Sequence, residues 1–466
     1  MALLRFRPFG FFCVYLLSIT VQTEGRQIGS AALQEDYSFL TIQQSSLLPS
    51  DTCNTSTPES GGQTILKLVN RHGPCSSLNK DLPNPLDVLL EDQVRVSMIQ
   101  KMVATASVNG SQVATSSVDL PLYSGATYGT ANYIVQVRLG TPSVLQSLLF
   151  DTGSRTTWVQ CQPCFRCHAQ KDPLFNPSQS STYNQFSCLS PACSASPFTD
   201  CSGTLCAYKI VYGDKSYAVG VLSSDTLTLS DNDVIPNYIY GCSNDVQGLF
   251  QKEAGLLGFS NAPLSFVSQT SSRYNGVFSY CIPSTESSTG FLAIGSIRSA
   301  NQQPFYVPFS SQSYINSFYY AIDITGISVG GTRLQTSLSP FFPEPIIVDS
   351  GTVITRLSAE TYSGLRDAYS LGMSAYPTAG AVSILDTCFD LRGYNTITVP
   401  RIVFTFNNAV DVRLPSSLTY VGNSRFCLAY APTTDVSILG NTQQKTLEIV
   451  FDTFGKRLGF RSGGCG

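Results

Sequence analysis

Short apolar runs broken by turn residues dominate the chain from Tyr133 onward. Gly, Pro, Asn and Asp separate these runs at short intervals, which is typical of strands joined by tight turns. The clearest predicted strands are residues 133–137, 147–150, 208–212, 226–229, 346–348 and 402–406. One stretch, residues 359–369, instead has helical periodicity, with Ser358 as its N-cap. The pattern therefore predicts an all-β body with one substantial helix.

Residues 26–120 have a different composition, rich in Ser, Thr, Gln and Asn and poor in aromatic residues. Residues 65–69 are predicted to form a short strand, and Asn84 caps a helix that begins at Pro85. We expect one face of this helix to consist of the apolar positions that recur every four residues, Leu86, Leu90, Val94, Met98 and Met102. A polar segment ahead of the body predicts a propeptide, and a disordered linker is the alternative.

The first 25 residues have the pattern of a secretion signal. Arg5 and Arg7 precede an apolar run from Phe9 to Val21, and polar residues follow it. The run is too short to cross a bilayer, which needs about 20 apolar residues. A plastid-targeting segment is the alternative interpretation, because both are address signals rather than structure.

Two segments about 200 positions apart nearly repeat each other, at residues 148–154 and 346–352. Each is an apolar strand end that continues into Asp-Thr/Ser-Gly-Ser/Thr. A carboxylate at the end of a buried strand is costly unless its surroundings satisfy it. Its occurrence in two copies predicts that Asp151 and Asp349 lie face to face and share a proton. Such a pair activates water by general acid–base chemistry, so we expect an acid protease.

The residues after each aspartate suit this role. Glycine allows close approach of the backbone, and the following hydroxyl residue donates to the outer carboxylate oxygen. The predicted supporting residues are Thr152, Gly153, Ser154, Ser350, Gly351 and Thr352.

An apolar-apolar-Gly triplet follows each motif about a hundred residues later. The triplets are Leu256-Leu257-Gly258 and Ile438-Leu439-Gly440. With these triplets, the two aspartate motifs and the segments 132–142 and 158–161, the chain resembles pepsin-type aspartic proteases, closest to their plant nepenthesin-like branch. The resemblance covers about residues 133–465.

The resemblance implies a bilobal all-β fold with a central cleft, preceded by the signal peptide and propeptide. It also implies that Tyr212, Gly213 and Asp214 form a flap over the substrate, with Tyr212 supplying a phenol. The predicted organisation is residues 1–25 signal peptide, 26–120 propeptide, 121–330 N-terminal catalytic lobe with a cysteine-rich insert at 161–206, and 331–466 C-terminal catalytic lobe. Such proteases need neither a cofactor nor a metal.

Relatives of this kind commonly place a basic residue over the aspartate pair in the precursor. By position, Lys67 and Arg71 are the residues we predict for this contact. Two positions depart from the family pattern and add a cation near the cleft rim, Arg155 and Lys215. We expect both to be solvated on the surface, and the alternative is a shift in substrate preference or in the pKa values of the aspartates. Trp158, the single tryptophan, is predicted to lie in the core.

The chain has 15 cysteines. Cys13 lies in the signal and Cys53 and Cys75 in the propeptide, which leaves an even number in the body, as six disulfides require. The candidates are Cys161, Cys164, Cys167, Cys188, Cys193, Cys201, Cys206, Cys242, Cys281, Cys388, Cys427 and Cys465. A zinc site at Cys161, Cys164 and Cys167 is the alternative.

Charge excludes one class of partner. The formal net charge is −3 and only 13% of residues are charged, so no basic surface for nucleic acid is expected. We expect protein or peptide substrates, a monomer, no stable membrane insertion and secretion to the apoplast, with vacuole or plastid as alternatives. Asn54 and Asn109 lie in glycosylation sequons. The competing hypothesis is a pepsin-fold binding or inhibitor protein without activity.

Overall fold

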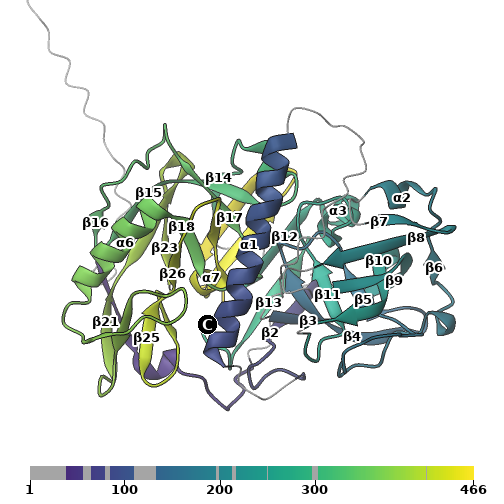
Figure 1. The fold of residues 1–466 in the computed structure, drawn as a ribbon, viewed down its shortest axis with the longest axis horizontal. Helices are drawn as coiled ribbons and strands as arrows, with labels where there is room; N and C mark the ends of the chain where they lie inside the picture. Colours follow the sequence, from purple (N-terminus) through teal and green to yellow (C-terminus); the bar gives the residue numbers. More distant parts are fainter. Residues whose placement is uncertain are drawn as a thin grey trace, which may run out of the picture. The chain divides into compact units, whose positions relative to one another are not determined.

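The computed structural model describes residues 38–55, 64–78, 84–109, 133–195, 199–211, 217–248, 250–295, 303–415 and 417–465. These residues form two β lobes with a small number of helices, so the all-β bilobal prediction is confirmed (Figure 1). Within the described ranges, no helix is long and apolar enough to cross a membrane. The predicted signal peptide, residues 1–25, lies outside them.

The largest sheet joins distant parts of the chain. Fifteen strands of the described residues belong to it, and β2 from the N-terminal segment lies between β13 and β3. The C-terminal strands β28 and β29 extend the same sheet beyond β12. Its strands are β2 (Thr64–Asn70), β3 (Tyr133–Leu139), β4 (Val144–Asp151), β5 (Trp158–Gln160), β6 (Asn184–Gln185), β7 (Thr199–Ser202), β8 (Leu205–Val211), β9 (Tyr217–Ser230), β10 (Asp233–Gln247), β11 (Gly255–Gly258), β12 (Val277–Cys281), β13 (Thr289–Ile294), β14 (Phe305–Pro308), β28 (Leu447–Asp452) and β29 (Arg457–Ser462).

The second lobe is built on an eight-stranded sheet with the order β23-β22-β15-β17-β27-β18-β26, and β16 pairs with β15. Because β15 pairs with β17 and β22, the strand pairing favours a lobe boundary before Ala321 rather than after residue 330. The strands are β15 (Ala321–Val329), β16 (Thr332–Arg333), β17 (Glu344–Val348), β18 (Thr355–Ser358), β22 (Ile402–Phe406), β23 (Val410–Leu414), β26 (Tyr430–Thr433) and β27 (Ser437–Leu439).

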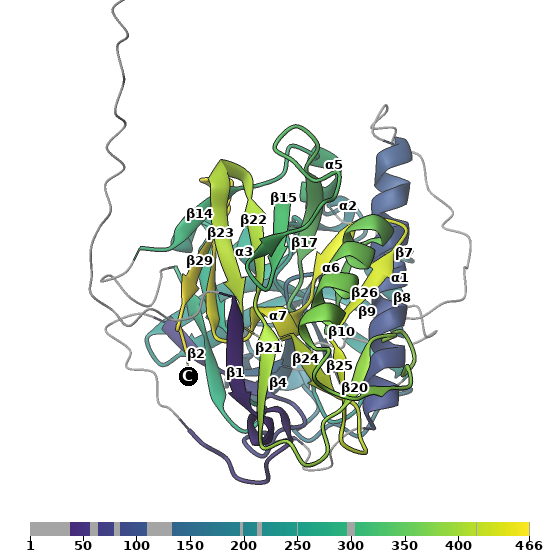
Figure 2. The ribbon, with the colours of Figure 1, turned by 90° about the vertical axis from the view of Figure 1, so that its left-hand side faces the viewer.

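Two small sheets complete the second lobe. One has the order β19-β20-β25-β24, and the other pairs the N-terminal strand β1 with β21 (Figure 2). The N-terminal segment therefore adds one strand to each lobe. The strands are β1 (Phe39–Gln43), β19 (Thr378–Ala379), β20 (Cys388–Asp390), β21 (Thr396–Pro400), β24 (Leu418–Tyr420) and β25 (Arg425–Leu428).

Two long helices occur where the sequence predicted them. In α6 (Ala359–Gly372), the side chain of Ser358 accepts a hydrogen bond from the Thr361 N–H, as expected of an N-cap. The others are single turns, which have too few residues for a periodic pattern. They are α2 (Pro191–Ser194), α3 (Phe266–Gln269), α4 (Ser271–Tyr274), α5 (Ser313–Asn316) and α7 (Asn441–Gln444).

The helix α1 (Pro85–Asn109) begins as predicted, since the Leu86 N–H donates to Asn84 Oδ1 at 3.1 Å. The apolar residues that recur at every fourth position do not form its buried face, since Leu86 and Leu90 are 44% and 58% exposed. A strict four-residue repeat drifts around a helix of 3.6 residues per turn, whereas alternating steps of three and four stay on one face. Leu89, Asp92, Val96, Ile99 and Val103 are buried at those alternating steps, and Arg95 beside them is buried as well.

The cysteines of the described residues form seven disulfides. Cys161, Cys164 and Cys167 are all oxidised, which leaves no thiolate of the proposed zinc alternative to bind a metal. Within the described ranges, no group of three or more His, Cys, Asp or Glu could hold a metal ion. The pairs are Cys53–Cys75, Cys161–Cys242, Cys164–Cys167, Cys188–Cys201, Cys193–Cys206, Cys281–Cys465 and Cys388–Cys427.

Candidate active site

The two repeated motifs end equivalent strands in the two lobes. Asp151 is the last residue of β4, which lies parallel to β11, and Gly258 pairs directly with it. Asp349 follows β17, which lies parallel to β27 in the same way. The two apolar-apolar-Gly triplets therefore each lie beside one aspartate, and the chain presents the same arrangement twice.

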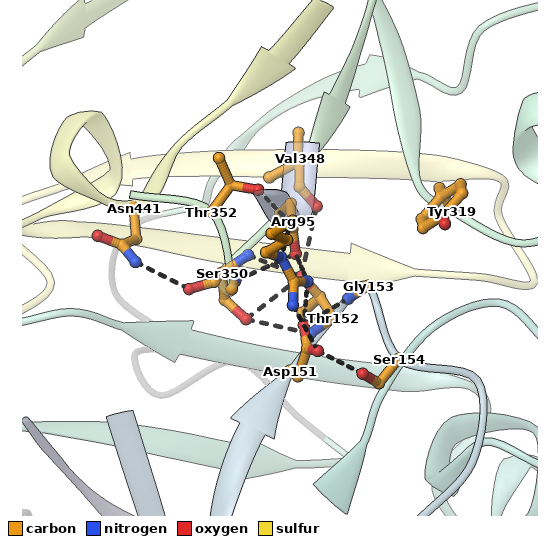
Figure 3. Close-up of polar contacts among 12 residues, drawn as sticks. Arg95, Asp151, Thr152, Gly153, Ser154, Tyr319, Val348, Ser350, Thr352 and Asn441 are labelled. Carbon is orange, nitrogen blue, oxygen red and sulfur yellow. Dashed lines mark hydrogen bonds and ion pairs between the residues drawn. The ribbon is translucent and has the colours of Figure 1, made fainter. Parts of the chain in front are cut away.

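The two aspartate loops are joined by a reciprocal pair of hydrogen bonds (Figure 3). The Thr152 N–H donates to Ser350 Oγ at 3.1 Å, and the Ser350 N–H donates to Thr152 Oγ1 at 2.9 Å. Both residues are buried, with 1% of their surface exposed. These bonds fix the distance between the lobes at the point where the carboxylates meet.

Each carboxylate also receives bonds from its own loop. Asp151 accepts from the Gly153 N–H at 2.9 Å and from the Ser154 hydroxyl. Asp349 accepts from the Gly351 N–H at 3.1 Å and from Thr352 Oγ1 at 2.6 Å. The residue types of both motifs thus satisfy two carboxylates whose exposed fraction is zero.

Both glycines are required by close approach rather than by an unusual backbone angle. A Cβ on Gly351 would lie 2.6 Å from Asp151 Oδ1. A Cβ on Gly153 would lie 2.9 Å from Asp349 Oδ1. Arg95 Nη2 would lie closer still to either added Cβ, so a side chain at either position would collide with the guanidinium and with the opposite carboxylate.

Arg95 of α1 contacts both aspartates, and Figure 3 shows it beside Asp151. Its Nη2 is 2.6 Å from Asp151 Oδ1 and 2.8 Å from Asp349 Oδ1, so one nitrogen bridges the two inner oxygens. Nη1 donates to Asp151 Oδ2 at 3.0 Å, and Nε donates to Asp349 Oδ2 at 2.8 Å. All four carboxylate oxygens are therefore bound to the guanidinium of one residue, Arg95, which is 7% exposed.

The guanidinium sets the ionisation of the pair. Burial raises the pKa of Asp151, but the charge of Arg95 and hydrogen bonds from Arg95, Ser154 and Gly153 outweigh it and hold the pKa below its ordinary value. Burial and the charge of Asp151 raise the pKa of Asp349, against the opposing charge of Arg95. Burial lowers the pKa of Arg95, but the two carboxylates reverse this and raise it, so Arg95 remains charged.

The predicted basic residues, Lys67 and Arg71, do not reach the aspartates. Lys67 is exposed on β2, opposite Phe291. Arg71 pairs with Glu91 of α1 at 3.3 Å and with Glu253 at 3.7 Å. Lys67 is the middle residue of β2, where sheet pairing holds it, and Arg71 directly follows that strand and is held by its two ion pairs. The sequence did contain an indication of the role of Arg95. It lies next to the buried face of α1, where a charged residue needs a partner of opposite charge.

Sequence reasoning also missed two residues of α7 that support the second aspartate loop. Asn441 Nδ2 donates to the Ser350 carbonyl at 3.0 Å, and Gln444 Nε2 donates to the Asp349 carbonyl at 3.1 Å. Tyr280 OH donates in turn to Gln444 Oε1 at 2.6 Å. These polar side chains follow the second triplet directly, and that position was their only signal.

The remaining predicted positions have mixed outcomes. Tyr212, Gly213, Asp214 and Lys215 lie outside the described residues. Arg155 is not solvated as expected: its guanidinium stacks 3.6 Å from the ring centre of Phe318, and burial lowers its pKa. Trp158 has zero exposed surface and packs edge-on against Phe250, so its core placement is confirmed.

The two sequons lie in the N-terminal segment. Asn54 is exposed, and its backbone N–H donates to the Ser287 carbonyl at 2.7 Å. Asn109 is the last residue of α1, and its side chain lies outside the described part. Glycosylation at either position remains a prediction.

Comparison with known proteins agrees with this geometry. Two sequence families match the chain, described as the N-terminal and C-terminal xylanase inhibitor domains, over residues 133–296 and 319–462. An aspartyl protease family protein of Arabidopsis thaliana is 45% identical over 91% of this chain and 93% of its own. Aspartic proteinase nepenthesin-2 of Nepenthes gracilis is 33% identical over 77% of this chain and 83% of its own.

Solved structures show the same fold at greater distance. The crystal structure of basic 7S globulin from soybean covers 72% of this chain and 92% of its own, with a TM-score of 0.56 and 17% identity. That likeness concerns the fold alone. With the matched domains and the curated relatives, the paired aspartate loops show that the chain belongs to the pepsin-type aspartic proteases, in their plant nepenthesin-like branch.

Proposed function

We propose that the chain is the inactive precursor of a secreted aspartic endopeptidase. In this proposal residues 1–25 are a signal peptide and residues 26–120 a propeptide. Asp151 and Asp349 are the catalytic pair of the processed enzyme. The similarity to relatives named as aspartic proteases supports the chemistry, and the disulfides support an oxidising compartment.

The observation that carries the proposal is the contact of Arg95 with all four carboxylate oxygens. In this state no water or peptide can reach the inner oxygens, since Nη2 occupies the position between them. A helix that blocks the site and precedes the body in the chain is suited to a propeptide that inhibits its own enzyme. Its removal from the aspartates is then the activating step.

Once α1 has left, the two carboxyls share one proton, because like charges this close do not both ionise. The ionised carboxylate takes a proton from a water molecule held between the pair, and the water oxygen attacks the scissile carbonyl. The protonated carboxyl donates its hydrogen bond to the carbonyl oxygen as charge develops there. Collapse of the tetrahedral intermediate breaks the C–N bond, and the leaving amine takes a proton from the pair.

A second candidate function is a pepsin-fold binding or inhibitor protein without activity. The matched families are described as xylanase inhibitor domains, which favours this alternative. Against it, the present residues supply both aspartates, both motif glycines and the hydroxyls that support them. A binding protein has no need of this set or of a guanidinium that covers it.

The test is digestion of an unfolded protein by the acid-treated precursor, with and without pepstatin. We expect cleavage in acid only, blocked by pepstatin and absent in Asp349→Asn. Unimpaired cleavage by Asp349→Asn would refute the role of the pair. No cleavage by correctly processed, disulfide-bonded wild type would favour the binding protein.

A further inference from the structure

A second buried charge joins α1 to the body, one helical turn before Arg95. The Asp92 carboxylate has zero exposed surface. It accepts hydrogen bonds from the Val353 N–H at 2.6 Å, the Ile354 N–H at 3.2 Å and Arg356 Nη2 at 2.9 Å. These three donors all belong to residues 353–356, which directly follow the second aspartate motif.

The donors belong to the body, although Arg356 Nη2 also contacts Gln93 Oε1 of α1 at 3.3 Å. Arg356 lies in β18, is 1% exposed, and donates from Nη1 to the Ile354 carbonyl at 2.8 Å, which holds the plane of the guanidinium. Its Nε has no hydrogen-bond partner in the described part of the chain. Two backbone N–H groups and one anchored guanidinium therefore point at the position of the Asp92 carboxylate. Together they are a set of donors that a carboxylate prefers.

Release of α1 removes the Asp92 carboxylate and leaves these donors in the body. A cation beneath the surface without its anion is unfavourable, so the position favours another carboxylate. Asp92 and Arg95 are three residues apart, which in a helix is a rise of about 4.5 Å. A substrate bound as an extended peptide spans the same distance in one to two residues, at about 3.3 Å each. Because Arg95 marks the reacting centre, the position of Asp92 corresponds to a substrate side chain close to the scissile bond.

We propose that Val353, Ile354 and Arg356 form a carboxylate-binding subsite in the processed enzyme, which selects Asp or Glu within two residues of the scissile bond. The inference rests on the proposed protease function. In the precursor the propeptide fills this subsite with Asp92, just as it covers the aspartate pair with Arg95. The competing outcome is that the Asp92–Arg356 ion pair only stabilises the packing of α1 on the body and that the processed enzyme binds no carboxylate there.

The experiment compares matched peptides that differ only by Glu or Gln, placed in turn at each position within two residues of the scissile bond. Cleavage by the processed chain is measured at about pH 5.5, where a Glu side chain is ionised. At one position we expect kcat/KM for the Glu peptide to exceed that for the Gln peptide by about tenfold or more, the size of a charge-assisted hydrogen bond. Arg356→Gln should reduce that ratio to about one. Arg366→Gln, which changes a more exposed arginine of α6 in the same lobe, should preserve it.

Equal kcat/KM for the two peptides at every position would overturn the subsite, and this wild-type comparison decides even if Arg356→Gln does not fold. If the processed chain cleaves nothing, the protease proposal fails, and binding of the same peptides is measured by fluorescence anisotropy. A preference for Glu that Arg356→Gln abolishes then still supports the subsite. Equal binding of the Glu and Gln peptides refutes it.

Discussion

Thr152 and Ser350 each donate a backbone N–H to the hydroxyl of the other across the two lobes. They occupy equivalent positions in the two repeated motifs, directly after Asp151 and Asp349. This pair of hydrogen bonds therefore has near two-fold symmetry. It holds the carboxylates of Asp151 and Asp349 on opposite sides of the symmetry axis. Neither loop can shift without breaking a bond made by the other.

Thr152→Ala should destabilise the precursor. The change removes the acceptor of the buried Ser350 N–H, and an unsatisfied buried donor costs about 1–3 kcal/mol. The measurement is the free energy of unfolding in guanidinium chloride. Thr41→Ala is the matched control, because Thr41 is exposed and its hydroxyl contact with Thr398 is long, at 3.5 Å. Equal stability of the two variants would show that the reciprocal bonds contribute nothing.

The contact of α1 with the aspartates should weaken as the pH falls. Arg95 lowers the pKa of both carboxyls while α1 is bound, so the bound state holds fewer protons than the released state. Its stabilisation is complete where both carboxyls are ionised and is lost as they protonate. Asp349, whose pKa is raised by burial and by Asp151, protonates first, and Asp151, whose pKa is lowered, protonates at a lower pH.

Hydrogen exchange of the α1 amides over a pH series tests this order, after correction for the intrinsic pH dependence of exchange. As the pH is lowered, protection of the α1 amides should begin to fall at a pH above the ordinary pKa of an aspartate. It should be lost at a pH below that value. Asp349→Asn, which carries no titrating group, should remove the first part of the change. Protection of α1 that is constant across the acid range would contradict the electrostatic account.

The disulfide Cys281–Cys465 should contribute more stability than Cys388–Cys427. It ties the C-terminus to β12 across a sequence separation of 184 residues, against 39 for the other pair. In the chain-entropy account, the longer loop is worth about 5 kcal/mol and the shorter about 4 kcal/mol. Paired Cys→Ser variants, compared by denaturant unfolding, give the order. A greater loss of stability on removal of Cys388–Cys427 than of Cys281–Cys465 would mean that local packing outweighs chain entropy.

The aspartate site was accessible from sequence because its signal is local. The glycine and the hydroxyl residue that support each aspartate lie within three residues after Asp151 or Asp349. The repeated motif therefore indicates the acid–base pair without knowledge of the fold. The strands around them were equally visible, because each is a short apolar run ended by turn residues. The core position of Trp158 followed from its size and apolar character.

The partner of the site was not accessible in the same way. Arg95 lies 56 positions before Asp151 and 254 before Asp349, and only the packing of α1 brings them together. The four-residue apolar repeat along α1 does not follow its buried face, so the repeat gave no indication of Asp92 or Arg95. Arg155 was misjudged because its cost of burial is offset by the Phe318 ring, which lies far from it in the sequence.

The central claim is that Arg95 holds a catalytic aspartate pair inactive, and the direct measurement is the pH at which the precursor begins to cleave an unfolded protein. Loss of charge-assisted bonds worth about 1.5–3 kcal/mol should move this pH upward by about 1–2 units in Arg95→Gln. Lys67→Gln, which changes an exposed lysine of the same segment, should activate at the pH of the wild type. Activation of Arg95→Gln at the wild-type pH would contradict the account.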